Sequence, residues 1–147
     1  MYVCGHLGDC YALRQQWNEA IKAYIRAFQY DTPKVKICNA IAHALMKQHK
    51  YVDAIIWYET TTKIPLPTQS ALYNPSSYTW IPYLQMCVCY NHLGEYEKAS
   101  YYNALAAKYI PNDPRIINIL MIYYERRIKN KKAYSLLEKR SAFLFIY

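Results

Sequence analysis

Four alanines recur at nearly regular intervals, and this recurrence constrains the fold more than any other feature of the sequence. The intervals are 34, 45 and 34 residues, and the alanines are Ala20, Ala54, Ala99 and Ala133. Around Ala99, the stretch Tyr83–Pro111 is typical of two short helices, because Gly94 can take the positive φ that ends a helix and Pro111 cannot continue one. One helical hairpin cannot bury its apolar face, whereas stacked copies can. The spacing therefore predicts an all-α solenoid of about four helical hairpins in a single domain, residues 1–147.

The same spacing divides the chain into four units and an insert. The units cover residues 1–33, 34–65, 78–111 and 112–145. The interval of 45 exceeds 34 by 11 residues, which fall in the insert Ile64–Ser77, and its three prolines cannot continue a helix. Helices are expected near 1–14, 17–30, 34–49, 51–63, 80–93, 96–109, 114–129 and 131–143. An insert of this length is either functional or a passive connector, and both interpretations remain open.

Small residues mark where the two helices of a unit should approach most closely. These structural anchors are Gly8, Ala20, Ala54, Cys87, Ala99 and Ala133. The fourth unit departs from the pattern, because Met121 and Arg140 replace its small residues, and its many Lys and Arg side chains suit a solvent-facing cap. Asp113 is a good N-cap and Pro114 a good first helical residue, so its first helix should begin there.

The first unit carries a recognisable repeat pattern. Leu7, Gly8 and Tyr11 lie on its first expected helix, and Trp17, Ala20, Tyr24, Ala27 and Pro33 follow. With the period of 34, this pattern resembles the tetratricopeptide repeat (TPR). The resemblance implies a right-handed α-solenoid whose first helices build a concave binding surface.

The block Tyr78–Asn103 carries a second, narrower resemblance. Together with Ala54–Tyr58 and the proline-containing insert, it is similar to the C-terminal helical tail of bacterial family-2 glycosyltransferases that end in TPR repeats. Asn103 contributes to the resemblance, since it occupies a position that is usually aromatic. The similarity extends over roughly Leu7–Glu125 and implies a bacterial protein. In that family the nucleotide-sugar-binding sheet lies upstream of the repeats.

No catalytic, metal-binding or cofactor-binding motif is present in the sequence. The chain has no Asp-x-Asp pair, and Cys87 and Cys89, two residues apart, point to different sides of a helix rather than to one zinc ion. The odd count of five cysteines favours reduced thiols in the cytoplasm. No run of about 18 apolar residues occurs, so no membrane span is expected. We therefore expect that the chain by itself is not an enzyme and needs no cofactor.

Binding is the function that the repeat pattern favours. The concave face is expected to include His6, Asp9, Leu13, Asn39, His43, Lys47, Leu84, Val88, Asn91, Asn118, Ile122 and Arg126. These residues do not reproduce the Lys/Asn/Arg constellation with which chaperone-binding TPR domains hold a C-terminal carboxylate. The leading hypothesis is a scaffold that binds a protein or peptide, serving partner binding, acceptor binding or dimerisation in a glycosyltransferase-like protein.

Two alternative functions remain open. In the first, the chain is part of an active glycosyltransferase whose catalytic domain is absent from this sequence. In the second, the chain is a basic adaptor that binds nucleic acid or an acidic partner. The net charge of +8 favours the adaptor, but much of that charge lies in the capping unit. Because the first helix has no N-terminal cap, Tyr2, Val3 and Trp17 are also expected to expose an apolar flank, which predicts a homo-oligomer.

Overall fold

The computed structural model describes residues 2–28, 35–67, 74–119, 121–123, 125–126 and 128–129, with side chains from residue 4 onward. Its helices, in chain order, are α1 (Tyr2–Leu13), α2 (Trp17–Ala27), α3 (Val35–Lys47), α4 (Tyr51–Lys63), the 3-10 turn η1 (Pro75–Ser77), α5 (Trp80–His92) and α6 (Tyr96–Ala107). Residues 114–119 and the described residues of 121–129 are helical as well. The described part of the chain contains no strand, which confirms the all-α prediction.

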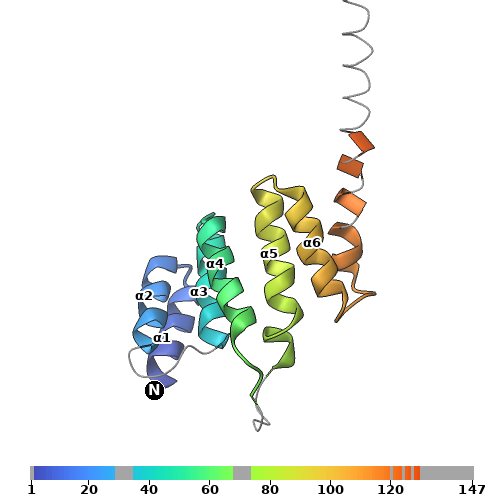
Figure 1. Ribbon diagram of the computed structural model, residues 1–147. Helices are drawn as coiled ribbons and strands as arrows, with labels where there is room; N and C mark the ends of the chain where they lie inside the picture. Colours follow the sequence, from blue (N-terminus) through green and yellow to red (C-terminus); the bar gives the residue numbers. More distant parts are fainter. Residues whose placement is uncertain are drawn as a thin grey trace, which may run out of the picture.

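The helices pair into hairpins that stand in a row (Figure 1). α1 packs on α2, α3 on α4 and α5 on α6, and the second helix of each hairpin also contacts the first helix of the next. The helical segment that starts at residue 114 follows α6. This order confirms the predicted solenoid for the first three hairpins, whereas the helix expected near 131–143 lies outside the described residues.

The anchors predicted from small residues are buried. Ala20, Ala54 and Cys87 are fully buried and Ala99 nearly so, while Ala133 lies outside the described residues. Gly8 is buried under Tyr24, and a Cβ added to it would lie 2.3 Å from Cε1 of that ring. Only glycine therefore fits between α1 and α2 at this point.

The turn inside each hairpin contains one residue with a left-handed backbone. These residues are Gln15 at φ 58°, His49 at φ 60° and Gly94 at φ 78°. The predicted positive φ of Gly94 is confirmed. The other two occupy the same place in their hairpins but carry a side chain, which makes this conformation less favourable than it is for glycine.

Two apolar clusters hold the hairpins together. The larger contains residues of the first two hairpins together with Met86 and Cys89 of α5, and the smaller joins Leu84, Ala106 and Ile116. Beside the smaller cluster, the fully buried Asn103 donates a hydrogen bond from Nδ2 to the carbonyl oxygen of Ile116 at 3.0 Å. The residue that breaks the usual aromatic pattern therefore ties α6 to the helix that follows it.

The C-terminal end of the insert, η1, packs against both α3 and α5. Asn39 of α3 donates a hydrogen bond from Nδ2 to the carbonyl oxygen of Ser77 at 3.0 Å. After α4 the backbone becomes extended at Ile64, as the prolines require, and residues 68–73 lie outside the described part. The apolar flank expected at Tyr2 and Val3 lies outside the described side chains, and Trp17 is partly buried.

Candidate binding face on the first helices

The residues predicted for the binding face lie on α1, α3, α5 and the helical residues after 114. The exposed ones are His6, Leu13, His43, Lys47, Asn118, Ile122 and Arg126, and the partly buried ones are Asp9, Asn39, Val88 and Asn91. Leu84 is an exception: it is only 3% exposed and packs with Ala106 and Ile116. The prediction that Leu84 contributes to an accessible face is therefore wrong, because its side of α5 meets α6 and the next helix.

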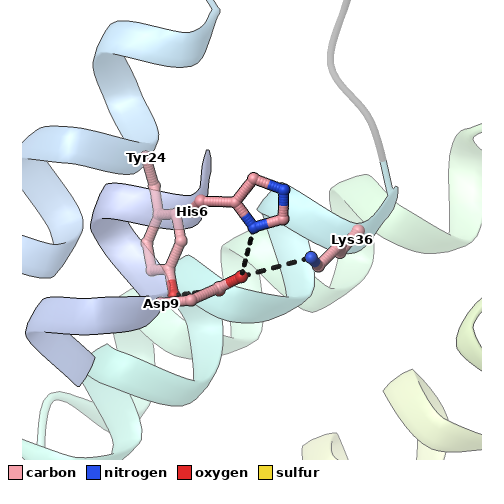
Figure 2. A network of polar contacts seen from close by, with 4 residues as sticks. All are labelled: His6, Asp9, Tyr24 and Lys36. Carbon is pink, nitrogen blue, oxygen red and sulfur yellow. Dashed lines mark hydrogen bonds and ion pairs between the residues drawn. The ribbon is translucent and has the colours of Figure 1, made fainter. Parts of the chain in front are cut away.

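The most strongly connected polar group of this face is centred on Asp9 (Figure 2). The buried hydroxyl of Tyr24 donates a hydrogen bond to Asp9 Oδ1 at 2.8 Å. Lys36 Nζ donates to Asp9 Oδ2 at 3.2 Å, and His6 Nδ1 lies 3.9 Å from the same oxygen. Side chains from α1, α2 and α3 therefore meet at one carboxylate.

The two oxygens of Asp9 have different environments. Tyr24 is 3% exposed, and burial together with its hydrogen bond to Asp9 raises the pKa of its phenol. The phenol therefore stays protonated and keeps donating to Oδ1. On the other side, Lys36 and His6 have side chains that are 70% and 66% exposed. One oxygen is thus held from within the fold, while the other is contacted from the solvent side.

A second group of residues lies further along α3. The rings of His43 and Trp17 meet edge to face with their centroids 6.2 Å apart. Desolvation lowers the pKa of His43, and the charge of Lys47 contributes a smaller decrease. His43 is therefore a neutral imidazole near pH 7, and Lys47 is the cation at this end of the helix. We call the outward surface formed by His6, Asp9, Lys36, His43 and Lys47 the α1–α3 face.

Some predicted residues are already engaged within the fold. Asn39 holds the insert through Ser77, and its Oδ1 is buried without a hydrogen-bond partner among the described residues. The guanidinium of Arg126 lies 4.5 Å from the ring centroid of Tyr96. Asn91 and Ile122 line a cavity of about 20 Å³, which has room for about one water molecule. Ile122 and Arg126 remain exposed, but Asn39 is engaged by the insert and Arg126 by the ring of Tyr96.

Sequence reasoning did not include Tyr24, Lys36 or Arg115 in the site. Lys36 and Arg115 each lie three residues before a predicted face residue, Asn39 and Asn118, so helical spacing could have identified both. Arg115 lies over the ring of Trp80 at 4.7 Å from its centroid. No sequence signal pointed to the hydroxyl of Tyr24, because its partner lies 15 residues away on another helix.

Reactive groups do not gather on this face. In the described part of the chain, no group of three or more His, Cys, Asp or Glu residues could hold a metal ion. Burial raises the pKa of the Cys87 and Cys89 thiols to about 12 each and that of Cys38 to about 11, so all three remain protonated. None of the described helices is long and apolar enough to cross a membrane.

The arrangement of hairpins is that of TPR domains, and comparison with solved structures shows the same fold. The first TPR domain of human RPAP3 matches with a TM-score of 0.71 and 17% identity over 90% of this chain and 96% of that domain. The first TPR of Spaghetti (RPAP3), bound to the HSP90 peptide SRMEEVD, matches at 0.67 and 15% identity over 86% of this chain and 92% of the other. The TPR2AB domain of yeast Sti1, in a complex with pHSP90, matches at 0.71 and 16% identity over 95% of this chain and 55% of the other.

These similarities confirm the TPR resemblance at the level of the fold. No protein-family model and no curated protein matches the sequence. Nothing in the comparisons links the chain to glycosyltransferases, so that part of the sequence interpretation lacks support.

Proposed function

We propose that this chain is a protein-interaction module that binds an extended segment of a partner protein across the α1–α3 face. The observation that carries the proposal is the set of ionisable side chains that hairpin packing leaves at the surface of two adjacent first helices. α1 and α3 lie next to each other there, since Lys36 reaches Asp9 and a Cβ on Gly5 would lie 3.3 Å from Ile37 Cδ1. Hydrogen bonds that involve charged groups are stronger than neutral ones, so such a surface can hold a polar segment.

Structural neighbours support this type of function. TPR domains of RPAP3 were solved with the HSP90 peptide SRMEEVD and with the HSP70 peptide SGPTIEEVD. This chain shares their fold, but identities of 14–15% do not transfer a ligand. Its own face must therefore define the partner.

The glycosyltransferase hypothesis remains a finer proposal that rests on the sequence resemblance alone. In that case the module would bind an acceptor or dimerise within a longer protein. Light scattering of the purified chain tests the dimer, and a monodisperse monomer at high concentration would contradict it. No contact among the described residues supports the hypothesis of a nucleic-acid adaptor, and we therefore do not propose that function.

Binding to a random library of immobilised, terminally capped nonapeptides tests the proposed function. The wild-type chain should select a reproducible subset of peptides. A double variant, His43→Ala with Lys47→Ala, should lose most of this binding because both side chains belong to the α1–α3 face. The matched control is Lys22→Ala on α2, which removes another exposed lysine, paired with Glu19 at 2.8 Å, from outside the face. Absence of selected peptides, or equal loss in the control, would contradict the proposal.

A further inference from the structure

We infer that Asp9 makes the α1–α3 face selective for a partner segment with one basic side chain, which replaces Lys36 on the carboxylate, and an acidic neighbour that pairs with the released Lys36. The inference rests on the proposed function and specifies the chemistry of its ligand. Four observations support it. Asp9 is the sole acidic residue of three first helices, its carboxylate has a fixed orientation, its partner Lys36 can be replaced, and the surrounding groups are not acidic.

Asp9 is the only acidic residue in α1, α3 and α5. Lys36 and Lys47 are the lysines of the same three helices, which contain no arginine. A cationic group of a ligand therefore finds a single carboxylate on these helices. One unique contact of this kind fixes the register of an extended segment, as a lone polar position does in other assemblies.

The carboxylate is oriented before any ligand arrives. Tyr24 lies beneath Asp9, is 3% exposed and donates to Oδ1 at 2.8 Å. Gly8, one residue before Asp9, leaves no spare space beside that ring, because any Cβ there would overlap it. The hydroxyl is therefore held in place, and Oδ2 is directed toward Lys36 and His6. Preorientation of this kind lowers the entropic cost of binding.

The contact between Lys36 and Asp9 can be exchanged. The Lys36 side chain is 70% exposed, and exposed ion pairs of flexible lysines contribute little to stability. A guanidinium presents a rigid fork of donors and loses less conformational freedom for each hydrogen bond than an ammonium does. An arginine of the partner can therefore compete for Oδ2, and it is favoured over a lysine.

The surrounding groups determine what accompanies the basic residue. His6 lies beside Asp9 on α1, Lys36 and Lys47 lie on α3, and neither helix offers a second carboxylate. A second cation in the partner would be repelled, whereas an acidic residue would pair with the released Lys36. A carboxylate placed directly at Asp9 would be repelled as well.

The same nonapeptide library tests this inference separately from the proposed function. Peptides selected by the wild-type chain should be enriched in one Arg or Lys with an acidic residue nearby. The variant Asp9→Asn keeps an oxygen that can accept from Tyr24, and it should bind the selected peptides about tenfold more weakly or worse. Replacing the arginine of a selected peptide by the neutral isostere citrulline should weaken binding to the wild-type chain by a similar factor. This second measurement does not depend on the folding of a variant.

The possible outcomes are distinct. If no peptide is selected, the proposed function fails and the inference fails with it. If peptides are selected without a basic residue, or if both Asp9→Asn and the citrulline peptide bind as well as the originals, the face binds peptides but Asp9 does not select them. Lys36→Ala removes the internal competitor and should not weaken the contact with arginine, whereas the control Lys22→Ala should leave both affinity and selectivity unchanged. A loss of arginine selectivity in Lys36→Ala would also contradict the proposed exchange.

Discussion

Replacing Gly8 by alanine should destabilise the first hairpin, and the structure supplies an internal control three residues earlier in the same helix. A Cβ at position 8 would lie 2.3, 2.4 and 2.8 Å from Cε1, Cδ1 and Cζ of Tyr24. These atoms belong to a rigid ring that is 3% exposed and whose hydroxyl is bonded to Asp9. The ring cannot move away without losing packing or its hydrogen bond, and overpacking of this kind costs about 1–3 kcal/mol.

The control is Gly5→Ala. Among the described residues, a Cβ at position 5 would meet only Ile37 Cδ1, at 3.3 Å, and this atom is the end of a flexible side chain. Both substitutions gain up to about 1 kcal/mol of helix propensity, because alanine is a better helix former than glycine. The net effect should therefore be up to about 2 kcal/mol of destabilisation at position 8 and up to about 1 kcal/mol of stabilisation at position 5.

The informative quantity is the difference between the two variants. The gain in helix propensity largely cancels in this difference in the free energy of unfolding. What remains is about 1–3 kcal/mol, which is the cost of the contact with Tyr24. Urea unfolding followed by circular dichroism measures this difference, provided that the two variants have equal m-values. Adding Tyr24→Leu should reduce the cost of Gly8→Ala, since the rigid ring is then absent. If Gly8→Ala proves as stable as Gly5→Ala, the close approach of α1 and α2 at Gly8 is refuted.

Three further predictions concern other parts of the fold. Gln15 and Gly94 both have a left-handed backbone, which glycine adopts more easily than other residues do. Gln15→Gly should therefore stabilise the chain by about 0.5–1 kcal/mol in urea unfolding, and Gly94→Ala should destabilise it by a similar amount. The opposite sign for either variant would contradict this prediction. Ala99→Leu should destabilise the third hairpin by about 1–3 kcal/mol, since Ala99 is buried, and unchanged melting would show that its site has room. Hydrogen bonds from the Arg115 side chain and backbone lower the pKa of Asp113 to about 2, so its stabilising effect should be complete above about pH 4 and lost as the pH falls toward 2. A carboxyl NMR titration measures the midpoint, which should rise in Arg115→Ala but stay below about 4, because the backbone N–H of residue 115 still donates to Asp113.

The sequence alone determined the hairpins and their order. Alanines repeated at intervals of 34 and 45 residues indicated buried contact points, and Ala20, Ala54 and Ala99 are buried. Gly94 indicated where one first helix ends, and Asp113 indicated where the next helix begins, as the hydrogen bond from the Arg115 backbone to its carboxylate confirms. These predictions succeed because each depends on a few neighbouring residues or on a short repeat, whose conformational preferences are largely local.

Only the tertiary structure decided which of the predicted face residues are available to a partner. Leu84 fits the helical spacing of the face but is buried, because the packing of α5 against α6 and the following helix covers that side. Asn39 fits it as well but holds Ser77, 38 residues away. The spacing along one helix identifies residues on the same side, but it does not determine how far the neighbouring helices extend over them.

The candidate site around Asp9 depends on the same kind of information. Asp9, Tyr24 and Lys36 come from three helices, and their contacts span 15 and 27 residues. The sequence identified Asp9 as a face residue but not its partners. Those contacts are set by the angle and distance at which α2 and α3 pack on α1, and these depend on the fit of many side chains at once, including the space that Gly8 leaves for the ring of Tyr24.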